Sequence, residues 1–160
     1  MFKEQLNTKS SFFLLINCLN GCLIVLSTGQ SLWSPRAVVA SVGDDVVLPC
    51  LFRPPRDVSG QTLEWSRPDL DPKFAFVFVW RSSLELTVLR NPAFAGRATL
   101  FTDELKHGNI SLKLTSVGVS DDGTYRCFVP ELGIDSTVRL HVGIGRRLFV
   151  LHTQEFVLNM

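Results

Sequence analysis

Two cysteines in the body of the chain constrain its fold more than any other feature. Cys50 and Cys127 lie far apart, each in a short apolar segment, and the segment after Cys50 contains Trp65. Residues 121–127 read Asp-Asp-Gly-Thr-Tyr-Arg-Cys. The other two cysteines lie near the N-terminus, so if a signal peptide carries them away, the remaining two have one possible pairing. A cytosolic chain would keep them as thiols, so the N-terminus decides whether a disulfide forms.

The N-terminus is typical of a secretory signal peptide. Lys3 and Lys9 give it a positive start, residues 12–26 are mostly apolar, and residues 27–29 are small. The apolar stretch is about 15 residues long, whereas a transmembrane helix needs about 20. We therefore predict a signal peptide over residues 1–29. A signal anchor and a buried core helix are the alternatives.

The body of the chain contains short β-type segments and no long segment of helical period. Runs rich in Val, Leu, Phe and Thr are separated by Gly, Pro, Asp and Asn. In residues 110–114 and 137–142 apolar and polar residues alternate, which is typical of strands with one face on a core and the other in water. About eight or nine such strands predict an all-β fold, a sandwich of two antiparallel sheets.

Four residues together indicate an immunoglobulin sandwich: Cys50, Trp65, Tyr125 and Cys127. In that fold, two facing cysteines join the sheets, a tryptophan packs against their bridge, and a tyrosine hydroxyl returns to the backbone to fix a corner. We expect Gly123 to give this corner its backbone freedom. A bridge that closes a loop of about 80 residues stabilises the fold by about 4–5 kcal/mol.

The sequence also resembles one family of V-type immunoglobulin domains. Residues 74–88 supply two additional strands, which is typical of the V type. Within that type, five segments resemble the butyrophilin and myelin oligodendrocyte glycoprotein family: residues 43–50, 63–68, 91–97, 100–112 and 122–130. The resemblance covers residues 35–143, which we predict to be the V-type domain.

This resemblance implies a cell-surface protein that binds a protein receptor on lymphocytes and regulates T-cell activation and T-cell receptor signalling. It also implies a salt bridge between Arg97 and Asp121. The expected location is the secretory pathway, followed by the external side of the plasma membrane or secretion. Residues 144–160 are predicted to be a short divergent tail without a transmembrane helix, so membrane attachment rests on the resemblance alone.

Two apolar stretches are candidate partner-binding surfaces. Every residue from 74 to 80 is apolar, so one alternating face of this strand must point outward. We predict an exposed aromatic row of Phe74, Phe76, Phe78 and Trp80; the alternative is that the face with Ala75, Val77 and Val79 points outward. The loop of residues 130–135 is the second candidate, because it shows two apolar side chains, Leu132 and Ile134. Ordinary packing is the competing interpretation of both.

A glycosylation motif occurs at Asn109-Ile110-Ser111. In an exported chain this Asn-x-Ser sequence is an acceptor for N-linked sugar when it lies near the surface. We predict that Asn109 is glycosylated.

Composition and motifs exclude several classes of function. The net charge is +1, from 16 basic and 15 acidic residues, so the chain has no electrostatic footprint for nucleic acid. The sequence shows no Ser-His-Asp set, no cluster with metal-ligand spacing and no nucleophile motif. We expect neither an enzyme nor a cofactor, metal or small-molecule substrate.

Three other functions share the predicted fold. A homophilic adhesion module, which would form a homodimer, and a soluble decoy form of a membrane ligand are the main alternatives. An antigen-receptor variable domain is disfavoured, because no Gly-x-Gly bulge follows Pro130.

Overall fold

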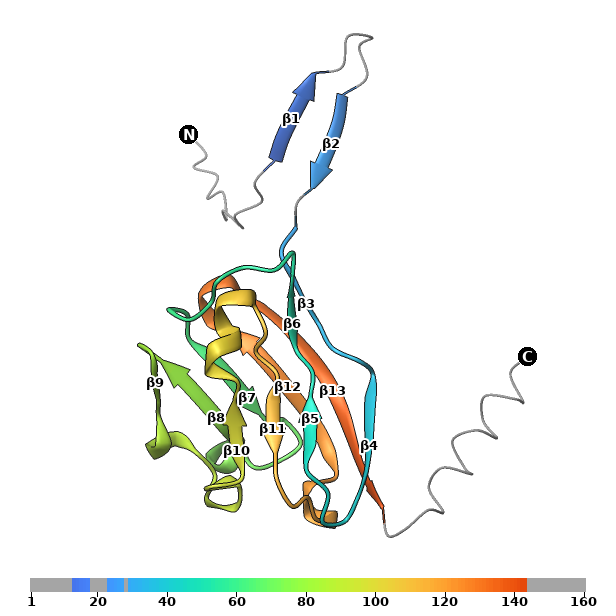
Figure 1. The fold of residues 1–160 in the computed structure, drawn as a ribbon, viewed down its shortest axis with the longest axis vertical. Helices are drawn as coiled ribbons and strands as arrows, with labels where there is room; N and C mark the ends of the chain where they lie inside the picture. Colours follow the sequence, from blue (N-terminus) through green and yellow to red (C-terminus); the bar gives the residue numbers. More distant parts are fainter. Residues whose placement is uncertain (1–12, 18–22, 28, 144–160) are drawn as a thin grey trace, which may run out of the picture. The chain divides into compact units, whose positions relative to one another are not determined.

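Figure 1 shows a computed structural model of the chain, which describes residues 13–17, 23–27 and 29–143. The chain divides into two units, Met1–Gln30 and Ser31–Met160. In the first unit, strands β1 (Phe13–Asn17) and β2 (Leu23–Ser27) form an antiparallel hairpin. The predicted signal peptide lies largely outside the described residues, and the predicted tail 144–160 lies wholly outside them. Both remain predictions.

The larger sheet of the second unit has six strands in the order β4-β13-β12-β7-β8-β9. Its pairs are antiparallel except that of β13 with β4, which is parallel. Its strands are β4 (Ala37–Ser41), β7 (Leu63–Ser66), β8 (Phe76–Arg81), β9 (Leu84–Glu85), β12 (Gly123–Val129) and β13 (Ile134–Gly143).

The opposite layer is smaller, and a short helical turn joins its strands β10 and β11 (Figure 1). It consists of a three-stranded sheet of β10 (Ala98–Leu100), β11 (Leu112–Leu114) and β5 (Val46–Leu48), and a pair of β3 (Ser31–Trp33) with β6 (Leu51–Arg53). The connections include short 3₁₀ helices: η1 (Pro72–Phe74), η2 (Thr87–Leu89), η3 (Pro92–Phe94), η4 (Thr102–His107), η5 (Val119–Asp121) and η6 (Pro130–Leu132).

The hydrophobic core lies between the two layers around a disulfide. Cys50 and Cys127 are joined, with their Cα atoms 6.8 Å apart. Trp65 belongs to the same buried cluster, and its indole N–H donates to the main-chain oxygen of Ile110 at 2.8 Å. This bond satisfies the one polar group that the buried ring carries. Apolar side chains from both sheets complete the core, including Leu48, Leu112 and Leu140.

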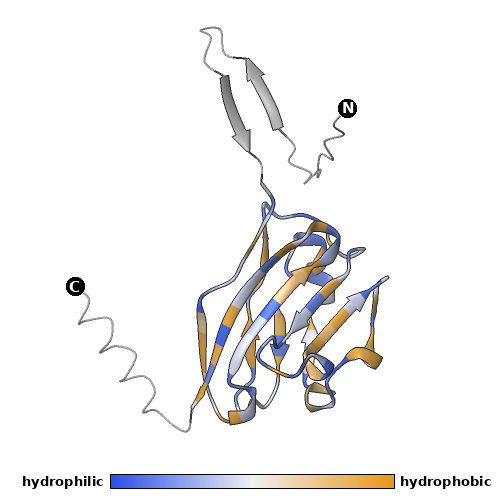
Figure 2. Ribbon diagram, turned by 180° about the vertical axis from the view of Figure 1, so that it is seen from behind, coloured by the Kyte–Doolittle hydropathy of each residue, from blue (hydrophilic) through white to orange (hydrophobic). Residues whose placement is uncertain are grey.

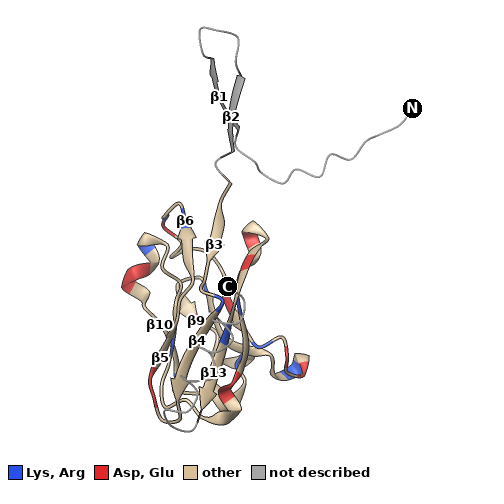
Figure 3. Cartoon of the chain, turned by 90° about the vertical axis from the view of Figure 1, so that its right-hand side faces the viewer, with Lys and Arg blue, Asp and Glu red and all other residues tan. Residues whose placement is uncertain are grey.

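The predicted V-type sandwich is confirmed. The two additional strands of residues 74–88 are present as β8 and β9, although β9 has only two residues and is followed by η2. Charged residues are scattered over loops and strands in Figure 3, in keeping with the nearly neutral composition.

Candidate protein-binding face

The corner before β12 is held by an aspartate and a tyrosine. Both terminal nitrogens of Arg97 donate to the carboxylate of Asp121 at 2.9 Å, and the N–H of Gly118 donates to it at 2.8 Å. Burial by itself raises the pKa of Asp121, but these hydrogen bonds outweigh it and hold the pKa below its ordinary value. The Tyr125 hydroxyl donates to the main-chain oxygen of Asp121 at 2.8 Å, and burial raises the pKa of Tyr125 to about 12. Arg97 and Asp121 thus form the ion pair that the resemblance implied.

A buried arginine behind this corner was missed by the sequence interpretation. Arg67 follows β7, and its guanidinium donates to both carboxylate oxygens of Asp69, at 2.9 and 2.7 Å. It also donates to the main-chain oxygens of residues 120–122, and its Cζ lies 5.0 Å from the centroid of the Tyr125 ring. The alternation of side chains along the strand could have predicted its burial. Leu63 and Trp65 face inward, so residue 67 faces inward too.

Gly123 has a different role from the predicted one. The described glycines with positive φ are Gly43, Gly96, Gly108 and Gly133, so Gly123 uses no conformation reserved for glycine. A Cβ atom built on Gly123 would lie under 3.0 Å from guanidinium atoms of Arg67. The expectation that Gly123 supplies backbone freedom is therefore wrong. Its missing side chain instead leaves room for Arg67.

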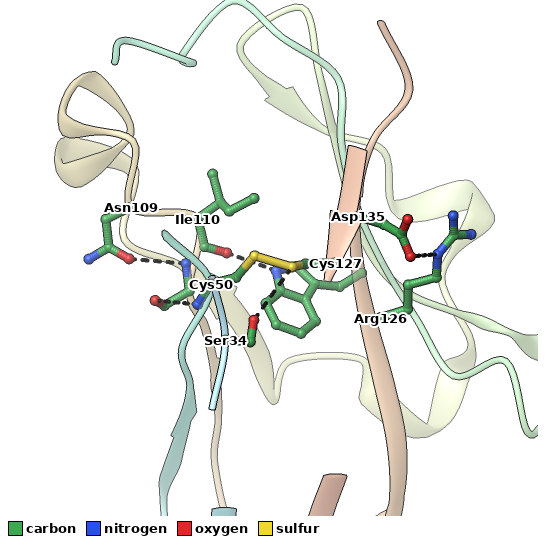
Figure 4. The surroundings of a disulfide bond; sticks show 9 residues. Ser34, Cys50, Asn109, Ile110, Arg126, Cys127 and Asp135 are labelled. Carbon is green, nitrogen blue, oxygen red and sulfur yellow. Dashed lines mark hydrogen bonds and ion pairs between the residues drawn. A yellow bond between two sulfur atoms is a disulfide. The ribbon is translucent and has the colours of Figure 1, made fainter. Parts of the chain in front are cut away.

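Asn109 lies on the Cys50 side of the disulfide, as Figure 4 shows. It is half-buried, forms an isolated bridge with Leu51, and accepts the N–H of Ser111 at 3.1 Å through Oδ1. The hydroxyl of Ser111 accepts the N–H of Cys50 at 3.1 Å. The two polar residues of the predicted sequon therefore stabilise the backbone next to the bridge. Glycosylation of Asn109 remains a prediction.

The predicted aromatic row in β8 does not form a single exposed face. A β-bulge shifts the register between Trp65 and Ser66, so that Val77 is an extra residue between Phe76 and Phe78. An extra residue interrupts strict alternation. Phe78 is consequently only 4% exposed and lies in the core with Val77.

The other members of the row are separated as well. Trp80 packs against the core, and its indole N–H donates to the main-chain oxygen of Ser59 at 3.1 Å. Phe76 is half-buried, opposite Ser66. Phe74 lies in η1 and is exposed. Phe78 and Trp80 are thus not available as an outward-facing aromatic pair.

The second predicted surface, the loop between β12 and β13, packs its apolar side chains against the core. Leu132 and Ile134 are half-buried and pack against the core. Glu131 directly precedes Leu132, and its carboxylate accepts the N–H of Thr62 at 3.0 Å. The apolar side chains therefore hold the loop in place, contrary to the expectation that they are displayed.

Strands β13, β12, β7 and β8 together form the outer face of the six-stranded sheet. Residues directly opposite each other in paired strands share a face, so the register defines rows across the sheet. One row runs Asp135, Phe128, Glu64 and Val79; the next runs Thr137, Arg126, Ser66 and Phe76. The hydropathy colours in Figure 2 alternate along these strands, as expected for a sheet with one face on the core. We call the group Glu64, Arg126, Phe128 and Asp135 the central quartet.

The central quartet is ordered by an ion pair and a ring contact. Figure 4 shows Arg126 on the opposite side of β12 from Cys127, pointing away from the disulfide. Its Nε donates to Asp135 at 2.9 Å, and its Cζ lies 4.4 Å from the centroid of the Phe128 ring. The disulfide core therefore fixes the strand that presents these side chains.

Four exposed apolar side chains lie in or next to β9 and in the segment before β8. Leu84 is 67% exposed and Val88 is 86% exposed, and Phe74 and Leu89 are also exposed. Figure 2 shows hydrophobic colour in the segment that follows β9. We call these four residues the edge patch. Sequence inspection identified Phe74 and missed the other three, because the chain turns into η2 where a longer strand was expected.

Two kinds of feature are absent from the part of the chain that the structure describes. Within residues 13–17, 23–27 and 29–143, no three His, Cys, Asp or Glu side chains are placed to hold a metal ion. In the same part of the chain, no helix is long and apolar enough to cross a membrane.

Comparison with known proteins connects this arrangement to a family. Residues 34–143 match the family model of the immunoglobulin V-set domain. Human butyrophilin subfamily 1 member A1 is 34% identical over 111 residues, which cover 69% of this chain and 20% of the relative. Myelin-oligodendrocyte glycoprotein from Pongo abelii is 30% identical over 122 residues, 71% of this chain and 48% of the relative. The CD276 antigen homolog from Xenopus laevis is 33% identical over 120 residues, 73% of this chain and 38% of the relative.

A solved structure agrees with these sequence matches. Bovine butyrophilin superposes with a TM-score of 0.65 at 30% identity, over 72% of this chain and 55% of that chain. The chain thus spans between about a fifth and a half of the length of these three curated relatives. It is a non-enzymatic protein, as its family and relatives are. The chain belongs to the immunoglobulin V-set domain family, with butyrophilins and myelin-oligodendrocyte glycoprotein among its relatives.

Proposed function

We propose that this chain is an extracellular ligand that binds a protein receptor on lymphocytes through the outer face of its six-stranded sheet, and so regulates T-cell activation. The central quartet is the observation that carries the proposal. It combines a ring, an ion pair and an additional carboxylate on adjacent central strands. Aromatic residues and arginine are the side chains enriched in protein interfaces.

The disulfide supports the extracellular part of the proposal. Disulfides persist in oxidising compartments and are rare in the cytosol, so the Cys50–Cys127 bridge fits a chain that passes through the secretory pathway. Display on the external side of the plasma membrane and secretion are both compatible with it. The matches to butyrophilin and the CD276 antigen homolog support the co-signalling role that the sequence resemblance implied.

A functional assay tests the proposal. The full chain, secreted and immobilised on beads, is presented to primary T cells together with a stimulus to the T-cell receptor. We expect it to change proliferation or cytokine release, and we expect the double variant Arg126→Ala/Phe128→Ala to lose the effect. Thr99→Ala, an exposed position on the opposite sheet, is the control and retains it. An equal response to beads with and without the chain would refute the proposal.

Homophilic adhesion is a second candidate, favoured by the edge patch. Several apolar side chains are exposed along this edge of the sheet, and exposed apolar surface is typical of association sites. In this alternative, the edge patch of one copy packs on that of a second copy and forms a homodimer.

A further inference from the structure

Glu64 lies at the centre of the outer face without a counter-charge of its own. Its cross-strand neighbours are Phe128 on β12 and Val79 on β8, both apolar. Val79 is only 2% exposed, so the carboxylate lies beside covered apolar surface. Within residues 29–143, no hydrogen bond or salt bridge engages the Glu64 carboxylate.

The two charged groups near Glu64 act on it in opposite directions, and neither forms an ion pair with it. Arg126 directs its Nε to Asp135 at 2.9 Å and stacks its guanidinium on Phe128. Glu131 adds a second negative charge, and its own carboxylate accepts the N–H of Thr62. Partial burial raises the pKa of Glu64; the charge of Arg126 opposes this effect and that of Glu131 adds to it. The free chain therefore holds an unfavourably placed carboxylate in the middle of its binding face.

We propose that Glu64 is the specificity-determining residue of this face and receives an arginine or lysine side chain of the protein partner. Docking removes water from the centre of an interface, and a carboxylate that loses water without gaining a cation is strongly unfavourable. A partner with a basic side chain at this point satisfies Glu64, whereas one with an acidic or apolar side chain there is rejected. This inference rests on the proposed function and adds the chemistry of the partner.

Charge variants of Glu64 test the inference, with Glu104 as the matched control. Glu104 is an exposed carboxylate in η4, away from the six-stranded sheet. Tetramers of the full secreted chain are titrated on primary T cells, for the parent and for Glu64→Gln, Glu64→Lys, Glu104→Gln and Glu104→Lys. We expect Glu64→Gln to weaken binding about tenfold or more, because loss of one partner of a buried charge pair has at least that effect. Glu64→Lys abolishes binding, and both Glu104 variants bind like the parent.

Thermal unfolding of the same variants separates specificity from folding. We expect Glu64→Gln to unfold at the same temperature as the parent or higher, because a neutral amide removes the cost of partly burying a charge. If Glu64→Gln lowered both the unfolding temperature and binding, Glu64 would be structural and the inference would be wrong. If the parent bound T cells and both Glu64 variants bound equally well, the inference would fail and the proposed function would stand. If the parent itself did not bind, the proposed function would fail and the inference with it.

Discussion

The guanidinium of Arg67 occupies the space where a side chain on Gly123 would lie. A Cβ atom at Gly123 would come under 3.0 Å from several atoms of that group. This relationship links the strand that carries Trp65 to the corner that carries Tyr125, because Arg67 follows the first and stacks on the second. The corner therefore depends on a buried cation as well as on its tyrosine.

Gly123→Ala tests this packing. The new methyl group displaces Arg67 from Asp69 and from the main-chain oxygens of residues 120–122, and leaves buried polar groups unpaired. We expect the free energy of unfolding to fall by about 2–4 kcal/mol in urea denaturation of the secreted chain. Gly60→Ala is the control, since a Cβ there meets nothing within 4 Å. Equal stability of the two variants would contradict the role assigned to Arg67.

Asp121 makes stability depend on pH. Its pKa in the folded chain lies below the ordinary value of 3.8, so its contribution is complete above that pH and is lost as the pH falls through the folded pKa. We expect Asp121→Asn to cost about 2–4 kcal/mol at pH 7, because Arg97 loses its charged partner.

The difference between parent and Asp121→Asn should shrink below about pH 4, in urea denaturation between pH 7 and pH 3. Asp103→Asn, which changes an exposed carboxylate in η4, serves as the control. A gap between parent and Asp121→Asn that stayed constant down to pH 3 would show that the charge of Asp121 is not responsible.

The edge patch makes a prediction about self-association. If it joins two copies, Leu84→Ser/Val88→Ser shifts the sedimentation coefficient from dimer to monomer without lowering the unfolding temperature, because both side chains are exposed. Val119→Ser, an exposed apolar side chain in η5, is the matched control. A parent chain that sediments as a monomer at tens of micromolar would exclude the homophilic alternative.

Asn109 makes a prediction about covalent modification. Expression of the chain in mammalian cells should give a product whose mass falls after treatment with an N-glycosidase. Asn109→Gln should remove that difference, because Asn109 is the acceptor of the predicted sequon. Since Asn109 Oδ1 also accepts the N–H of Ser111, we expect a loss of stability of about 1 kcal/mol as well. An unchanged mass after glycosidase treatment of the parent would contradict the assignment.

Local patterns predicted the frame of this domain better than its surface. The bridge, Trp65 and Tyr125 were predictable because the fold requires those residue types at set positions along neighbouring strands. The exposure of Phe78 was predicted wrongly, because a bulge between Trp65 and Ser66 adds one residue and resets the alternation of β8. Arg67 was missed because burial of a guanidinium depends on Gly123 and Tyr125, which are distant in sequence and meet only in the folded chain.

A matched pair of arginine and lysine variants tests most directly whether the outer face of the six-stranded sheet binds the partner. Arg126 and Lys113 have 38% and 40% exposed side chains, and each pairs with an aspartate, but they lie on opposite sheets. The measurement is the affinity of tetramers of the full chain for primary T cells. We predict that Arg126→Ala weakens binding about tenfold or more, as loss of a central arginine does in protein interfaces, and that Lys113→Ala leaves it unchanged. Equal affinities for the two variants, or a larger loss for Lys113→Ala, would contradict the account.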